Sequence, residues 1–318
     1  MKKCLLIAPL FNEYYKDIMH ELNKLGYNVT FGRDQPSDTT FSFFIKRISR
    51  TYFANKITSY VKRKILSYND DFELVIIILA YSFIETNIKN IREHFSKARF
   101  VYYTWDSIEN FPIIKSFFKY FDKVYSFDKR DCNQYDLNFL PLFYTKKSCK
   151  ESRRYDYSLI MSLYPTKVKA YLDIVNRMPK DINGFKYIVV KSRLFFLYYK
   201  IRYFRLFSHI SFKDVKFKTL KRSEVYKIFE DSNVVLDLPL EKQNGLTIRT
   251  FESLALGCKL ITTNINIIDY DFYDEDKILI LKKDSKFSKD YFKSISKKPF
   301  DEKNEYTVEK FVRKLILK

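Results

Sequence analysis

The sequence is poor in glycine, histidine and tryptophan, with 5 Gly, 3 His and 1 Trp among 318 residues. No G-x-G-x-x-G loop is present, which excludes a dinucleotide site built on that phosphate-binding turn. His20 and His94 fall within or near the end of predicted helices, and we interpret them as structural. The four cysteines are scattered without metal-ligand spacing, so they indicate no zinc site and favour a reducing compartment.

The sequence also lacks a long hydrophobic run. The longest, residues 74–81, is far shorter than the roughly 20 residues that a membrane-spanning helix needs. The N-terminus opens directly on a strand-like run, KCLLIAPL, so we expect no signal peptide. These features predict a cytoplasmic protein, with peripheral association at the inner face of the cell membrane left open.

Acidic residues are outnumbered: 38 Asp and Glu face 58 Lys and Arg, which gives a net charge of +20. Such an excess indicates a polyanionic neighbour, whether nucleic acid, an anionic membrane or a phosphorylated substrate. No nucleic-acid-binding motif accompanies the charge, so we expect no nucleic-acid partner. The interleaving of basic and aromatic residues keeps nucleic-acid binding as a distant alternative, which a steep salt dependence of binding would support.

Two segments contain no acidic residue at all and carry many aromatic side chains. Residues 41–68 hold seven Lys and Arg, and residues 192–207 include Lys200, Arg202 and Arg205. A basic amphipathic helix of this kind can lie on an anionic membrane surface. The alternative is a helix that packs into the core and keeps a solvated basic face.

Short apolar runs alternate with helical patterns along most of the chain, which predicts an α/β fold with mostly parallel sheets. A polar, basic stretch at residues 144–154 separates two such sets and is interpreted as a linker. The expected domains are therefore residues 1–148 and residues 149–318. The first of them opens with a strand–helix–strand unit of Rossmann type.

Carboxylates follow two predicted strands of the first domain, where ligands of α/β sheets bind. Asp106 comes after the strand at residues 98–104, and Asp128 and Asp131 follow the next one. A carboxylate in such a place can serve as a general base, and for this role we rank Asp106 ahead of Asp128. The alternative for each is a helix N-cap or loop carboxylate.

Residues 244–264, NGLTIRTFESLALGCKLITTN, predict a helix from about residue 247 to 256 followed by a short strand. The first turn of this helix carries Arg249, which is unfavourable for the helix dipole unless an anion binds there. A phosphate-bearing ligand is one explanation, and an ordinary surface arginine is the other. Lys167, after the first strand of the second domain, is a second candidate for a diphosphate contact, with a solvated side chain as its alternative.

The same stretch resembles the C-terminal signature of GT-B glycosyltransferases, most closely those of bacterial capsule and lipopolysaccharide synthesis. These enzymes carry Gly-Leu-Thr-x-Arg-x-Phe-Glu-Ala-Leu followed by Lys-Leu-Ile-Thr-x-Asn. The close resemblance covers about 30 residues. The matching positions here are Gly245, Leu246, Thr247, Arg249, Phe251, Glu252, Leu254, Lys259, Leu260, Ile261, Thr262 and Asn264.

The resemblance implies two Rossmann-like domains facing an interdomain cleft, with a last helix that can cross back to the first domain. It implies that Glu252 holds the ribose hydroxyls of a nucleotide-sugar, a role that suits a carboxylate acceptor. It further implies a transferase without a cofactor or catalytic metal, in which the nucleotide-sugar is the donor substrate. The expected binding residues are Asn244, Gly245, Thr247, Arg249, Glu252 and Lys167.

One position departs from the family pattern. Retaining members carry a second glutamate eight residues before the position of Glu252, and here that residue is Asn244. The expected function is therefore transfer of a sugar from a nucleotide-sugar to a surface-glycan or lipid-linked acceptor, by an inverting or a retaining route. The alternative is a non-catalytic GT-B-like module that binds a glycan or a partner protein.

Overall fold

The structure, a computed structural model, describes residues 1–36, 50–240, 243–282, 287–295, 300 and 305–317. The chain divides into two compact units, each described here by itself. The first contains Met1–Leu142 together with Thr307–Lys318, and the second is Phe143–Tyr306. The first unit thus ends a few residues before the boundary expected at 148, and it includes the end of the chain.

The first unit contains a six-stranded sheet in the order β2-β1-β3-β4-β5-β6, and every pairing in it is parallel. The central strands consist of apolar runs, as expected of strands covered on both faces. The strands are β1 (Lys2–Ala8), β2 (Tyr27–Arg33), β3 (Leu74–Ile78), β4 (Arg99–Tyr103), β5 (Lys123–Ser126) and β6 (Asn138–Phe139).

Side chains of the central strands alternate between the two faces of this sheet, as the strand period requires. Leu5, Ile77 and Tyr102 point into a core built with α3, α4 and η4, whereas Tyr103 points the other way and contacts Phe311 of α12. The helices are η1 (Phe11–Glu13), α1 (Tyr14–Lys24), α3 (Arg50–Tyr60), η2 (Val61–Ile65), α4 (Glu85–His94), η3 (Ile108–Asn110), η4 (Pro112–Tyr120), α5 (Lys129–Tyr135) and α12 (Val308–Ile316).

The described part of the basic segment 41–68 packs into the core of the first unit. Ile57, Val61 and Ile65 are fully buried, at one-turn spacing, while Lys62 and Lys64 are exposed. The core-packing alternative therefore holds for this part, and a membrane-bound helix is the wrong interpretation of it, because its apolar face is already covered. Residues 41–49 lie outside the described residues.

The terminal helix α12 is fastened to the first unit by hydrogen bonds at its C-terminal end. Arg99, at the start of β4, donates from its guanidinium to the carbonyl oxygens of Ile316 (2.7 Å) and Leu317. Tyr125 donates to the carbonyl of Lys314 at 2.8 Å. Arg99 satisfies carbonyls at the very end of the helix, and its positive charge suits the negative end of the helix dipole.

We expect Arg99→Ala to lower the free energy of unfolding by about 1 to 2 kcal/mol, because the last carbonyls of α12 lose charged donors. Urea unfolding followed by circular dichroism would measure the change. Lys97→Ala, which removes an exposed basic side chain two residues earlier, is the matched control and should change stability by less than about 0.5 kcal/mol. Equal effects of the two substitutions would contradict the role given to Arg99.

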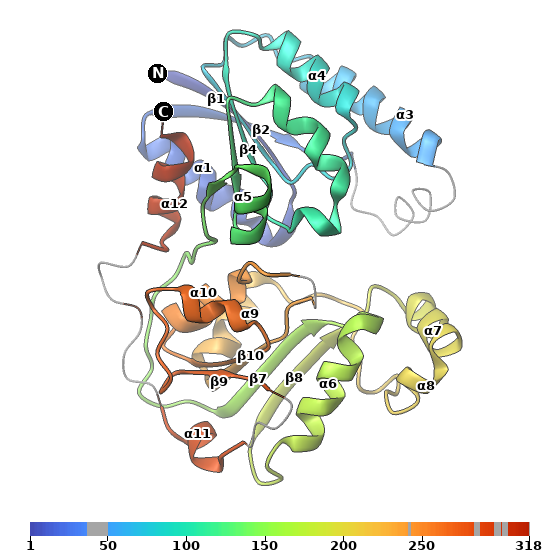
Figure 1. The fold of residues 1–318 in the computed structure, drawn as a ribbon, viewed down its shortest axis with the longest axis vertical. Coiled ribbons are helices and arrows are strands. Elements are labelled where there is room, and N and C mark those ends of the chain that lie inside the picture. The colour runs from blue at the N-terminus through green and yellow to red at the C-terminus, as the bar shows by residue number, and fades with distance from the viewer. Residues whose placement is uncertain (37–49, 241–242, 283–286, 296–299, 301–304, 318) are drawn as a thin grey trace. The chain divides into compact units, whose positions relative to one another are not determined.

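The second unit contains a five-stranded parallel sheet in the order β11-β10-β9-β7-β8 (Figure 1). Its central strand β9 is buried along its whole length, with Val234, Val235 and Leu236 around its middle. The strands are β7 (Tyr155–Ser162), β8 (Gly184–Val189), β9 (Ser232–Asp237), β10 (Lys259–Thr262) and β11 (Ile278–Ile280).

Helices cover both faces of this sheet, which makes it doubly wound. Val168 of α6, Phe196 of α7 and Phe292 of α11 belong to the core on one face. Phe229 of α9 and Leu256, at the end of α10, belong to the core on the other. The helices are α6 (Pro165–Arg177), α7 (Arg193–Arg202), α8 (Phe204–Phe207), α9 (Arg222–Glu230), α10 (Ile248–Ala255), η5 (Ile265–Asp269) and α11 (Lys289–Lys293).

The predicted α/β class and the two parallel-sheet units are confirmed. Within the described parts of the chain, no helix combines the length and apolarity that crossing a bilayer demands.

Candidate functional site

In the second unit, the sheet order places a topological switch point between the carboxyl ends of β7 and β9. The chain leaves β7 toward β8 on one side and later returns to form β9 on the other side of β7. Ligands of open α/β sheets bind at such a switch point, outside the carboxyl ends of the strands. The helix α6 begins directly after β7, and the segment that leads to α10 follows β9. The residues predicted to bind a nucleotide-sugar from this unit lie on these two connections and on α10.

A buried carboxylate fixes the beginning of α10. Asp237, the last residue of β9, is 1% exposed, and its Oδ2 accepts hydrogen bonds from the hydroxyls of Thr247 (2.5 Å) and Thr250 (2.9 Å). Its Oδ1 has no hydrogen-bond partner among the described residues. The predicted site residue Thr247 is thus the N-cap residue of α10 and ties the helix to the end of β9.

The other end of α10 is closed by a glycine, as the sequence predicted. Gly257 has a φ of +69°, the left-handed conformation that side chains disfavour. The amide of Gly257 donates to the carbonyl of Leu254 and that of Cys258 to Ser253, which together form a Schellman motif. Both ends of α10 are therefore set by specific contacts, and its N-terminal turn is held at the carboxyl edge of the sheet.

Arg249 lies in this first turn, half-buried, without a counter-charge. No hydrogen bond or ion pair is formed by its guanidinium within the described residues. A cation near the positive end of a helix dipole is unfavourable in the free protein. Bound anionic groups would reverse this cost, since they would meet the guanidinium and the free N–H groups of the turn together.

Asparagine side chains shape the loop in front of α10. Asn264, which follows β10, donates from its side-chain amide to the carbonyls of Asn244 (3.0 Å) and Gly245 (3.2 Å). Asn266 donates to the same carbonyl of Asn244 at 3.1 Å. Gly245 is buried by these contacts, and Asn244 is half-buried. The predicted residues Asn244 and Gly245 thus lie next to the N-terminal turn of α10, and the loop that holds them is braced by the adjacent strand.

Lys167 connects α6 to the segment that follows β9. It lies in the first turn of α6, is 9% exposed, and donates from Nζ to the carbonyl oxygen of Leu238 at 2.7 Å. A solvated side chain is therefore the wrong alternative for this lysine. Its ammonium group is held beside the segment that follows β9, where it adds positive charge to the carboxyl edge of the sheet.

Glu252 is 2% exposed, so the alternative of a solvent-exposed helix residue is wrong. Its Oε1 accepts a hydrogen bond from the Tyr226 hydroxyl at 2.8 Å, and this hydroxyl lies 2.6 Å from Oγ1 of Thr145. Burial raises the pKa of Tyr226 well above its ordinary value, and the Glu252 carboxylate raises it further. Glu252 is thus part of a buried network between α9 and α10, and its predicted contact with ribose stays a prediction.

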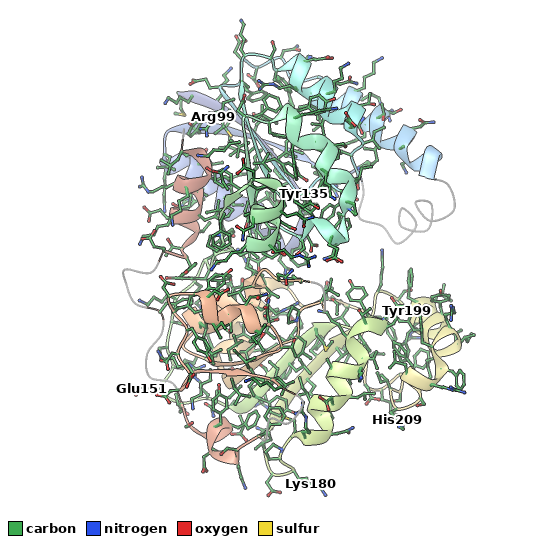
Figure 2. The ribbon with its side chains drawn as sticks, viewed as in Figure 1. Arg99, Tyr135, Glu151, Lys180, Tyr199 and His209 are labelled. Carbon is green, nitrogen blue, oxygen red and sulfur yellow. The ribbon has the colours of Figure 1, made fainter. Side chains whose placement is uncertain are left out.

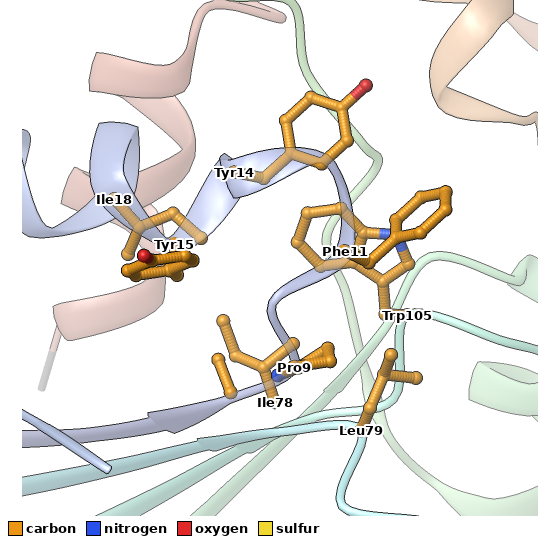
Figure 3. Close-up of a pocket in the computed structure, with 9 residues that line it drawn as sticks. Pro9, Phe11, Tyr14, Tyr15, Ile18, Ile78, Leu79 and Trp105 are labelled. Atoms are coloured by element: carbon orange, nitrogen blue, oxygen red, sulfur yellow. The ribbon is translucent and has the colours of Figure 1, made fainter. Parts of the chain in front are cut away.

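The first unit has a switch point of its own, between β1 and β3. An apolar pocket at this edge is lined from β1 and α1 by Pro9, Phe11 and Tyr15, and from the ends of β3 and β4 by Leu79 and Trp105 (Figure 3). Phe11 is 55% exposed. The rings of Tyr14 and Trp105 have their centroids 5.7 Å apart.

The backbone around this pocket is strained. Among the described non-glycine residues, positive φ angles gather at the carboxyl ends of β1, β3 and β4. Such conformations persist where the surrounding structure enforces them, and they cluster at functional sites. No residue of the pocket was among the sequence-predicted sites. The strained residues are Asn12 (46°), Glu13 (58°), Leu79 (65°), Ala80 (55°) and Trp105 (48°).

The two predicted catalytic carboxylates of the first unit differ in environment. Asp106 follows Trp105, is half-buried, and accepts hydrogen bonds from the Ser107 amide (3.1 Å) and the Asn110 side chain (3.3 Å). Asp128 is fully buried and caps α5: Oδ1 accepts from the Arg130 amide at 3.0 Å and Oδ2 from the Ser107 hydroxyl at 2.5 Å. With both oxygens engaged, Asp128 matches the N-cap alternative, whereas Asp106 is not the N-cap residue of the helix that follows it.

Asp131, in the first turn of α5, is 4% exposed and accepts a hydrogen bond from the Ile108 amide at 2.8 Å. Burial raises the pKa of its carboxyl to about 6, and the amide hydrogen bond opposes the shift. A carboxyl with a raised pKa in the folded state favours folding while it is protonated. The contribution is present in full below pH 3.8 and is lost as the pH rises through about 6.

We therefore expect Asp131→Asn to raise the free energy of unfolding at pH 7 by on the order of 2 kcal/mol, because an amide can be buried uncharged and still accept from Ile108. Below about pH 4 the advantage should vanish. Urea unfolding at several pH values would measure both. A constant difference between the two proteins across this range would contradict the raised pKa.

Comparison with solved structures places this architecture. Sucrose-phosphate synthase from Thermosynechococcus elongatus superposes with a TM-score of 0.58 at 11% identity over 90% of this chain and 87% of that chain. The Anabaena protein HepE, solved with UDP-glucose, gives 0.56 at 10% identity over 88% of this chain and 86% of its own. The chain has the GT-B fold. No protein-family model matches the sequence, and no curated protein matches it either.

The GT-B fold is also shared by proteins of other activity. UDP-GlcNAc 2-epimerase from Methanocaldococcus jannaschii gives a TM-score of 0.52 at 11% identity over 99% of this chain and 98% of that chain. At such identities the likeness concerns the fold alone. The reaction depends on the side chains at the carboxyl ends of the two sheets.

Proposed function

We propose that this protein is a glycosyltransferase that moves a sugar from a nucleotide-sugar donor to a surface-glycan or lipid-linked acceptor, as in capsule or lipopolysaccharide synthesis. The observation that carries the proposal is Arg249, a cation without a counter-charge on the first turn of α10, at the switch point of the second unit. HepE, which shares the fold, was solved with UDP and glucose and with UDP-glucose. A diphosphate is the group that this turn would bind.

The donor side would act mainly by electrostatics. Negative charge develops on the departing nucleoside diphosphate, and fixed positive groups that meet this charge lower the barrier. Arg249 and the free N–H groups of α10 would provide most of this positive charge. Lys167, whose ammonium group is fixed by its hydrogen bond to Leu238, would add to it from the side of α6. Glu252 would contact the ribose, and Asn244 and Gly245 would border the sugar. We invoke no cofactor and no catalytic metal.

The acceptor side belongs to the first unit in this proposal. The apolar pocket with Trp105 suits the apolar face of a sugar ring or the lipid-proximal part of an acceptor. Asp106, the residue after Trp105, is the candidate general base of an inverting reaction, since it is half-buried and lies beside the pocket rather than capping a helix. Asp128 is the weaker candidate because the Arg130 amide of α5 and the Ser107 hydroxyl engage both of its oxygens.

Binding of nucleoside diphosphates, measured by calorimetry, and turnover of a panel of nucleotide-sugars test the donor site. Arg249→Ala should weaken binding by roughly 10- to 100-fold, because a charge-assisted contact is lost. Arg154→Ala is the matched control: Arg154 is exposed just before β7, at the opposite edge of the same sheet. No nucleotide binding by the wild-type protein, or equal losses in both variants, would refute the donor site.

A second experiment tests the acceptor side with alkyl and aryl glycosides as probes. Trp105→Ala should raise the KM for the acceptor by about three- to tenfold, because the ring contact is lost, while the affinity for the nucleotide stays unchanged. Trp105→Phe keeps an aromatic ring and should recover much of the effect. If Trp105→Ala altered nucleotide affinity and acceptor KM alike, a specific acceptor role of this residue would be ruled out.

The second candidate function is a non-catalytic GT-B-like module that binds a glycan or a partner protein. The observation that favours it is Asn244, which stands where retaining relatives have a carboxylate. It predicts nucleotide binding without turnover of any donor.

For the enzyme we propose a cytoplasmic location with peripheral attachment to an anionic membrane, which fits a lipid-linked acceptor and the net charge of +20.

A further inference from the structure

The helices α7 and α8, drawn in yellow in Figure 1, form a hairpin next to α6 of the second unit. One side of the hairpin is anchored in the core: Phe196 and Phe207 are fully buried, with ring centroids 6.1 Å apart. Lys200 donates from Nζ to the carbonyls of Phe207 (3.3 Å) and Ile210 (2.7 Å), which closes the turn after α8. Tyr199 and His209, labelled in Figure 2, lie on this hairpin. The hairpin is thus a fixed part of the unit.

The opposite side of α7 is apolar as well, and it is exposed. Leu194, Leu197, Tyr198 and Ile201 follow one another at spacings of three and four residues, which places them on one face of α7, and Phe204 follows on α8. A soluble helix normally turns its polar side to water, and a helix that is apolar all round is normally buried. Within the described residues, nothing covers this face of α7. The exposed fractions are 69% for Leu194, 47% for Leu197, 40% for Tyr198, 72% for Ile201 and 64% for Phe204.

Arginines border the exposed face. Arg202 and Arg205 are exposed, and their guanidinium groups lie over the rings of Tyr203 (5.3 Å) and Phe204 (5.7 Å). Neither pairs with a carboxylate within the part of the chain that the structure describes. No Asp or Glu occurs between residues 181 and 214. The face thus combines apolar side chains with positive charge that no acidic residue offsets.

We infer that the exposed face of α7 and α8, with Leu194, Ile201, Arg202, Phe204 and Arg205 at its centre, docks on an anionic lipid bilayer. The apolar side chains enter the boundary between headgroups and acyl chains, and the arginines contact the lipid phosphates. A second copy of this chain fits the face less well, because a twofold interface would bring the same arginines against each other. The inference deepens the membrane attachment in the proposed function and rests on it for its purpose, but lipid binding is measured without turnover.

The experiment is flotation of the full-length protein with vesicles of phosphatidylcholine alone or mixed with phosphatidylglycerol. The wild-type protein should float with the mixed vesicles and stay behind with the neutral ones. Arg202→Gln/Arg205→Gln should weaken the partition by about 30-fold, at the strength expected for two charges near the surface. Ile201→Ser/Phe204→Ser should weaken it by at least about tenfold and leave thermal stability unchanged, because both side chains are exposed.

The matched control is Lys62→Gln/Lys64→Gln, which removes the same charge from the exposed side of η2, where the apolar residues are buried. It should change the partition by less than about threefold. Equal losses in the control and the arginine variant would show binding by overall charge and overturn the inference. The inference would also be overturned if the wild-type protein did not bind the mixed vesicles. The same holds if it formed dimers that Ile201→Ser/Phe204→Ser abolished. Nucleotide affinity is measured in the same variants. If the protein binds nucleotide but not the mixed vesicles, the lipid-docking inference fails and the proposed function does not.

Discussion

The hydrogen bonds from Thr247 and Thr250 to the buried carboxylate of Asp237 set the geometry on which the candidate donor site depends. They join the end of β9 to the beginning of α10, so that the free N–H groups of the helix are held at the carboxyl edge of the sheet. A carboxylate buried at this position is tolerated because two hydroxyls donate to it. These two hydrogen bonds, which act as a clamp, also fix the position of Arg249 on the first turn. Without this clamp, the arginine would sit on a helix whose start is free to fray.

The contacts around the clamp show how a local sequence pattern becomes a site. Asn264 lies after β10, yet its side chain braces the loop of Asn244 and Gly245 in front of α10. Lys167 begins in α6 and reaches the carbonyl that follows β9. Three connections at one edge of the sheet are thereby tied together. The site is a property of the parallel topology, since that topology brings the ends of β7, β9 and β10 to the same edge.

Local features of this arrangement could be predicted from the sequence. The apolar runs gave the strands, and Thr247, Arg249 and Gly257 marked the start, first turn and end of α10 from local preferences. The partners of Asp237, Lys167 and Glu252 could not be predicted. Each contacts a residue on another element, and no local pattern encodes which hydroxyl or carbonyl a parallel sheet will bring near. Asp128 had two interpretations from the sequence, a general base or an N-cap, and the hydrogen bonds from Ser107 and Arg130 match the N-cap.

The two basic, aromatic segments, 41–68 and 192–207, differ in burial although their sequences are alike. They share composition and lack acidic residues, yet Ile57, Val61 and Ile65 are buried in the core while Ile201 and Phe204 are exposed. Amphipathicity gives the face of a helix but leaves its cover undefined. In the first segment the cover is the sheet of its own unit. In the second, the sheet is met by the other side of the helix.

The attachment of α12 to Arg99 has a consequence for how the protein is made. The first unit is discontinuous in sequence, because it takes residues 1–142 and then the helix Val308–Ile316. Domains usually fold as units in the order of their synthesis. Here the first unit cannot be completed until the helix Val308–Ile316 has left the ribosome. The second unit, continuous from 143 to 306, is synthesised before that helix and can therefore complete its fold first.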